Sequence, residues 1–140
     1  MTDDADIWLR RERLETRRNP YPRIDYVVTV DGMINLAGRE SLDDRAYTVS
    51  VTVRYVPDKL TVTPDSLTGY LGHLSDGRWG ALEDLAAVML EDINNEVVPR
   101  WVLVTLTTRA SGLSYGHVVS MEDQQPKWKN PRLMERLVRI

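Results

Sequence analysis

A chain of 140 residues has the usual size of one domain, and 42% hydrophobic with 28% charged residues is typical of a globular protein. The net charge of −3 gives no argument for binding nucleic acid or an anionic membrane. No apolar run approaches the roughly 20 residues of a membrane span. The start, MTDDADIWLRR, is acidic where a signal peptide would be basic. We therefore expect a cytoplasmic protein that contacts no membrane.

The chain contains no cysteine, which excludes disulfides, thiolate metal sites and cysteine nucleophiles. Its two histidines, His73 and His117, are far apart in sequence, and we interpret each as an edge or surface residue rather than a catalyst. A histidine-rich metal site is therefore not expected, although carboxylates remain able to hold magnesium.

The first half of the chain predicts one helix and two strands. A charged helix is expected over residues 6–18, followed by the prolines of Asn19-Pro20-Tyr21-Pro22, which force a turn. Residues 25–30 (DYVVTV) are β-branched and predict a short strand, closed by a turn at Asp31-Gly32. The clearest strand is 47–55, in which apolar and polar residues alternate.

The second half predicts two helices, two strands and a last short helix. In chain order these are expected over 63–74, 81–95, 101–107 and 113–120 and from Asn130 onward. The 81–95 helix has an apolar stripe at helical spacing, formed by Leu82, Leu85, Met89 and Ile93. Its acidic residues are expected to lie off that stripe: Glu83, Asp84, Glu91 and Asp92.

This order predicts a single α+β domain over residues 1–140, with a four-stranded antiparallel sheet and two helices on one face. We interpret residues 1–21 as an N-terminal helix and linker, and 121–140 as a tail with a helix. Such a sheet leaves two edge strands unpaired, which favours a homo-oligomer that joins sheet edges.

The ββααββ order resembles the tunnelling fold, and four local motifs resemble one family with that fold. Residues 55–60 (YVPDKL) are similar to its strand-ending motif, and 22–26 (PRIDY) to its Pro-x-x-Asp-Tyr motif. Residues 82–101 match its long helix, and 111–114 its Gly-Gly-Ile-Ser turn. The chain thus resembles the NADPH-dependent 7-cyano-7-deazaguanine reductase (QueF) family over residues 22–114. The resemblance implies an oligomeric barrel.

Enzymes of that family use NADPH to reduce the nitrile of 7-cyano-7-deazaguanine. Their cysteine forms a thioimide with this nitrile, and a glutamate holds the deazaguanine base. By resemblance, Glu83 matches that glutamate. A carboxylate suits the task, because a guanine-like base presents two parallel N–H donors to its two oxygens. Without the resemblance, Glu83 would be interpreted as a solvated helix residue.

The catalytic and cofactor positions depart from the family pattern. The position of the family's catalytic cysteine falls at Arg39 or Glu40, and the position of the aspartate that shuttles a proton in those enzymes falls at Ala46 or Tyr47. Residues 63–68 lack both lysines of the cofactor motif, and Asp65 would repel the 2′-phosphate of NADPH. We therefore expect no cofactor and no thioimide chemistry.

Residues 32–46 are predicted to form a polar loop long enough to carry function. Within it, Glu40, Asp43 and Asp44 are candidate catalytic acids or bases, or ligands for one magnesium ion, and Arg39 is a candidate substrate-binding residue. The alternative is an ordinary solvated loop.

Three functions remain open. The first is recognition of a purine, deazapurine or pterin-like base through Glu83. The second is a different reaction on such a base, with the loop carboxylates as acid or base, so whether the chain is an enzyme stays open. The third is an oligomeric scaffold without a ligand. Basic termini also allow contact with nucleic acid, although solvated ends are the favoured interpretation: Arg10, Arg11, Arg13, Arg17 and Arg18, with Lys127 and Lys129 beside Trp128.

Overall fold

The computed structural model describes residues 4–36, 47–108 and 114–137. Within these ranges the chain forms six strands and four helices. The strands are β1 (Thr16–Arg18), β2 (Val28–Leu36), β3 (Tyr47–Val56), β4 (Leu60–Val62), β5 (Trp101–Thr108) and β6 (His117–Gln124). The helices are α1 (Asp4–Arg11), α2 (Ser66–Ser75), α3 (Leu82–Val97) and α4 (Pro131–Arg136).

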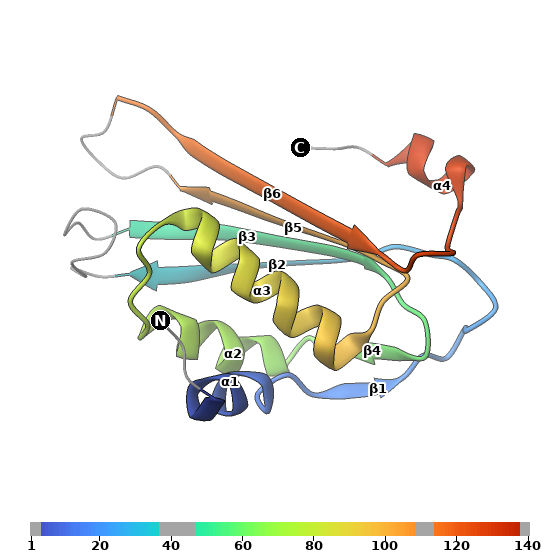
Figure 1. Cartoon of the computed structure of the whole chain (residues 1–140), viewed down its shortest axis with the longest axis horizontal. Helices are drawn as coiled ribbons and strands as arrows, with labels where there is room; N and C mark the ends of the chain where they lie inside the picture. The colour runs from blue at the N-terminus through green and yellow to red at the C-terminus, as the bar shows by residue number, and fades with distance from the viewer. Residues whose placement is uncertain (1–3, 37–46, 109–113, 138–140) are drawn as a thin grey trace.

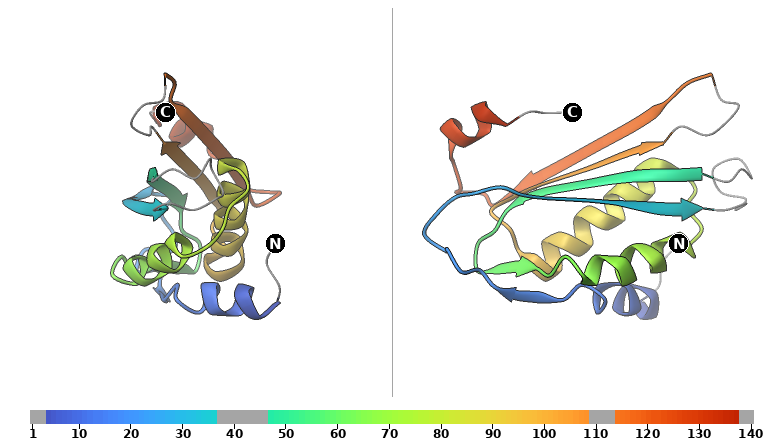
Figure 2. Two further views of the ribbon diagram at one scale, coloured as in Figure 1. Left: turned by 90° about the vertical axis from the view of Figure 1, so that its left-hand side faces the viewer. Right: turned by 180° about the vertical axis from the view of Figure 1, so that it is seen from behind.

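The main sheet is four-stranded and antiparallel, in the order β2-β3-β5-β6, so that β2 and β6 form its edges. Helices α2 and α3 lie side by side against one face, and α1 packs beneath them (Figure 1, Figure 2). The α+β fold class, the four-stranded sheet and the placement of two helices on one face are confirmed.

Strand β3 and helix α3 form the core in the way their sequence patterns predict. On β3, the residues that face the helices are buried: Val49, Val51, Val53 and Tyr55. Their neighbours Thr48 and Ser50 are exposed on the opposite face. The predicted stripe of α3 is buried against this surface, as expected from its helical spacing.

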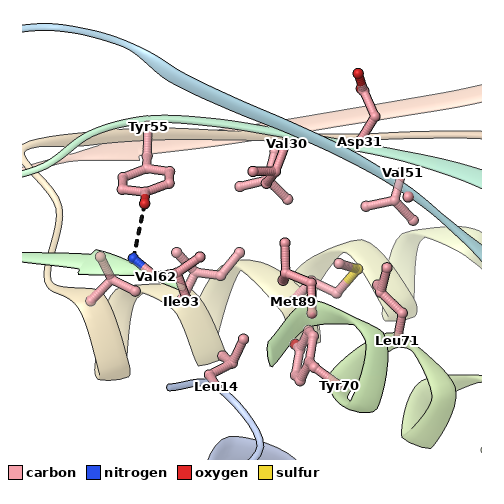
Figure 3. A pocket seen from close by; sticks show the side chains of 14 residues that line it. Leu14, Val30, Asp31, Val51, Tyr55, Val62, Tyr70, Leu71, Met89 and Ile93 are labelled. Atoms are coloured by element: carbon pink, nitrogen blue, oxygen red, sulfur yellow. Dashed lines mark hydrogen bonds between the residues drawn. The ribbon is translucent and has the colours of Figure 1, made fainter. Parts of the chain in front are cut away.

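A small apolar cavity remains between the two layers (Figure 3). Val30 and Val51 point into it from the sheet, and Met89 and Leu71 point into it from the helices, whereas Asp31 points away. Its volume is about 20 Å³, enough for about one water molecule, and its lining is apolar. Water needs polar partners, so such a void stays dry. It is a packing gap, too small to hold a substrate.

The N-terminal helix is shorter than the sequence predicts. It ends at Arg11, and residues 16–18 instead form β1, which pairs with β4 in the register Thr16 to Val62. The expectation of a helix to Arg18 was therefore wrong. Arginine-rich segments are compatible with either structure, and the partner strand β4, only three residues long, gave no sequence signal.

The predicted turn at Asp31-Gly32 is also wrong, because β2 continues through it to Leu36. Asp31 pairs with Thr52, whose hydroxyl donates to the Asp31 carboxylate over 2.8 Å. Gly32 allows α2 to approach closely, since a Cβ there would lie 2.4 Å from Leu71 Cδ1. Residues 32–36 therefore belong to the sheet and not to the polar loop. Similarly, β6 begins at His117 and extends to Gln124, later than predicted.

Asp92 was expected off the apolar stripe of α3, but it is fully buried. The buried Arg10 donates to both its oxygens, over 2.5 and 3.0 Å, and Arg11 and the Tyr70 hydroxyl donate to it as well. Burial and the adjacent Asp92 charge raise the pKa of Tyr70 well above its ordinary value of 10.0. Asp92 is buried because α1 packs over this side of α3 and supplies the two arginines that bind it.

Helix α4 begins at Pro131 with Asn130 as its N-cap, which agrees with the predicted start at Asn130-Pro131, and the Asn130 side chain accepts from the Leu133 backbone N–H. Leu133 packs on Trp101 and Leu103. Figure 1 places α4 on the side of the sheet away from α1, α2 and α3. It therefore covers one end of the face that the other helices leave open.

Candidate functional site

Glu83 is the second residue of α3, and its side chain is 53% exposed. Ala81 precedes the helix and offers no side-chain cap to the first backbone N–H groups. An acidic side chain in the first turn interacts favourably with the positive end of the helix dipole. The sequence prediction that Glu83 lies off the buried stripe is confirmed, and its carboxylate stays accessible.

His117, the first residue of β6, meets Glu83 across the fold. Its Nε2 lies 3.2 Å from Glu83 Oε2, and the histidine side chain is 39% exposed. The two histidines do not meet each other, because His73 instead lies 3.4 Å from Asp6. Sequence reasoning did not pair Glu83 with His117, since their contact depends on the register of β6 and not on any local motif.

The Glu83–His117 pair lies at the end of the sheet where β2 ends and β3 begins. Leu36 pairs with Tyr47, and Thr108 pairs with His117, so these strand ends are neighbours. Figure 1 shows the start of α3 at this same end. The candidate residues Arg39, Glu40, Asp43 and Asp44 lie outside the described residues, between the flanking residues Leu36 and Tyr47.

Parts of three motifs that carry the family resemblance, residues 22–26, residues 55–60 and the end of residues 82–101, meet at the opposite end of the sheet. Arg100 donates to Asp25 over 3.0 Å and to Asp58 over 3.2 Å. Asp25 also accepts from Trp128 and Asn130. Burial alone would raise the pKa of Asp25, but these hydrogen bonds and the Arg100 charge hold it below its ordinary value of 3.8. These motif residues therefore stabilise the fold rather than form the candidate site.

Two larger hollows open on the surface. One, of about 670 Å³, lies beside α1 and the connection from α2 to α3, with Arg78, Trp79 and Glu91 in its lining. The other, of about 480 Å³, runs between α2 and the edge strand β2. Glu83 lines neither of them. Among the described residues, the Glu83 side chain is half exposed.

Several basic and aromatic side chains at the termini bind carboxylates of their own chain. Arg10 and Arg11 bind Asp92, and the Trp128 indole N–H donates to Asp25. These contacts occupy three of the residues that the nucleic-acid interpretation needed.

Within residues 4–36, 47–108 and 114–137, no three His, Asp or Glu side chains gather as a metal site. Over the same ranges, none of the helices has the length and apolar character needed to cross a bilayer.

The order and pairing of these elements define an α+β fold with a four-stranded antiparallel sheet and two helices on one face. The crystal structure of the archaeosine synthase QueF-Like in the apo form has this fold, with a TM-score of 0.57 and 19% identity. The match covers 70% of this chain and 95% of that one.

In sequence, the chain is 28% identical over 125 residues to the NADPH-dependent 7-cyano-7-deazaguanine reductase of Syntrophus aciditrophicus (strain SB). That alignment covers 85% of this chain and 83% of the relative. No protein-family model matches the chain. The chain is therefore similar in sequence to a 7-cyano-7-deazaguanine reductase and shares its fold with a QueF-like protein, in agreement with the resemblance that the sequence motifs indicate.

Proposed function

We propose that this chain binds a purine or 7-deazaguanine-type base through Glu83, without thioimide nitrile reduction. The observation that carries the proposal is the exposed Glu83 carboxylate at the start of α3, in a chain similar to a 7-cyano-7-deazaguanine reductase. The name of this relative suggests the chemical class of the ligand. The two oxygens of the accessible Glu83 carboxylate can accept from the two parallel N–H donors of such a base.

A carboxylate has room for about four hydrogen bonds, and His117 accounts for one of them here. Two parallel N–H donors of a guanine-like edge need only one position on each oxygen. The Glu83 side chain is half exposed and lines neither of the two surface hollows, so the proposal includes a second wall that encloses the base. In the proposal a neighbouring subunit of a homo-oligomer supplies it.

The proposal is tested by titration calorimetry against purines, pterins and 7-deazaguanines, with wild type and Glu83→Gln. The amide of the Glu83→Gln variant would replace one carboxylate oxygen with an NH₂ group, which would face an N–H donor of the base instead of accepting from it. We expect a loss of about 1.5–3 kcal/mol, or about 10- to 150-fold in affinity.

Glu91→Gln is the matched control, because Glu91 is an exposed glutamate on the same helix. It should bind as wild type does. Equal binding by wild type and Glu83→Gln would show that the anchor is misassigned and would favour a scaffold without this ligand.

Nitrile reduction requires a thiol to form the thioimide, and the chain has no cysteine. The purified protein should therefore show no NADPH oxidation that depends on 7-cyano-7-deazaguanine. Such oxidation in a preparation free of other reductases would refute this part of the proposal.

A further inference from the structure

The contact between His117 and Glu83 joins two elements whose relative positions the core fixes. His117 pairs with Thr108, and two residues further along β6 Val119 is buried against the helices. Alternation along the strand puts His117 on that same face, toward α3. A shift of one residue in the register would turn it to the opposite face. The sheet register therefore aims this imidazole at the start of α3.

The contact is suited to holding the Glu83 carboxylate in one orientation. With its proton on Nε2, the imidazole donates to Glu83 Oε2 over 3.2 Å. This bond limits the rotamers of a glutamate side chain that is otherwise half exposed. It leaves Oε1 and the second lone pair of Oε2 available to accept from a ligand.

We infer that His117 is a positioning residue for Glu83, holding its carboxylate in one orientation for the two N–H donors of a guanine-type base. This inference rests on the proposed function. Immobilising a side chain costs free energy on binding, and a contact already present in the free protein removes part of that cost. His117 would thus contribute to affinity through Glu83 without touching the ligand.

The test is a double-mutant cycle measured by calorimetry with 7-cyano-7-deazaguanine and guanine as probes. His117→Leu removes the donor and should weaken binding by about 2- to 10-fold. His117→Gln keeps an N–H donor near the same place and should restore most of the loss. In a Glu83→Gln background, His117→Leu should have no further effect, because the residue acts only through the carboxylate.

Thermal unfolding checks that each variant is folded, and the affinities across the cycle separate this role from a purely structural one. A structural role would lower affinity equally in both Glu83 backgrounds, and His117→Gln would not rescue it. Either that pattern, or unchanged affinity in His117→Leu, overturns the inference while leaving the Glu83 proposal intact. If wild type bound neither probe and no other base of the panel, the proposed function and the inference would both be refuted.

Discussion

Glu83 and Asp92 are both carboxylates of α3, yet their surroundings are opposite. Glu83 faces solvent at the start of the helix, with one histidine beside it. Asp92 is fully buried and is surrounded by Arg10, Arg11 and Tyr70. Buried charges persist only when paired and hydrogen-bonded, so Asp92 acts in stability, whereas the accessible Glu83 is able to meet a ligand.

Asp92→Asn tests this division. The substitution removes the buried counter-ion of Arg10, which keeps its contact with the partly exposed Asp6 carboxylate. Removing one partner of a buried pair costs about 3–5 kcal/mol. Urea unfolding at one fixed protein concentration measures the loss. Glu91→Gln, at the exposed neighbouring position, should change stability by no more than about 0.5 kcal/mol. Similar losses in the two variants would contradict the role assigned to Asp92.

Asp25 predicts a pH dependence of stability. Its folded pKa is depressed below 3.8, so its contribution is present above the unfolded pKa and is lost as the pH falls through the folded value. Asp25→Asn should therefore be less stable than wild type at neutral pH, and the gap should narrow below about pH 3.8. Denaturant titrations at pH 7 and pH 3 measure it. A gap of constant size would refute the assignment.

Among individual residues, the sequence predicted the exposed position of Glu83 because that depends on helical spacing alone. It failed for Asp92 and did not foresee the His117 contact. Both depend on which distant element packs nearby: α1 over Asp92, and β6 beside Glu83. Local periodicity has no information about such partners.

At the scale of elements, glycines near α2 give a paired prediction. Gly32→Ala places a Cβ 2.4 Å from Leu71 Cδ1, so the end of the flexible Leu71 side chain must shift, and we expect a loss of about 1 kcal/mol, at the lower end of overpacking costs. Gly72→Ala meets nothing within 4 Å on α2 and should stabilise the helix by about 0.5–1 kcal/mol. Thermal unfolding compares the two. Stabilisation by Gly32→Ala would show that β2 and α2 are not closely packed.

Strands β2 and β3 show where the prediction of elements from sequence worked and where it failed. Alternating residues predicted β3 correctly, because one face is buried and the other exposed. In β2, Asp31-Gly32 is a common turn pair, yet pairing with β3 outweighs this local preference. Long-range strand pairing decided β1 and β4 as well, which periodicity could not reveal over three residues each.

At the scale of the whole molecule, the open edges of β2 and β6 favour assembly. We expect the protein to be a homo-oligomer that joins sheet edges, which is also consistent with the second wall that an enclosed base needs. Light scattering at micromolar concentration should give a mass above 16.1 kDa. A uniform monomer would contradict the expectation.

An edge substitution tests the route of assembly. Val118 on β6 is 52% exposed, and Val118→Lys puts a charge on the edge, which discourages strand pairing between chains. This variant should shift toward monomer by light scattering. Val98→Lys, equally exposed at 54% but outside the sheet, is the control and should assemble as wild type does. If both variants assemble normally, the β6 edge is not an interface.

The central claim is that Glu83 recognises two adjacent N–H donors of a base. The most direct test is calorimetry of wild type with 7-cyano-7-deazaguanine and with its analogue lacking the exocyclic amine. A site built to bind both donors loses one hydrogen bond to a charged group with the analogue, so we expect binding about 10- to 150-fold weaker. Equal affinity for the two compounds would contradict the claim.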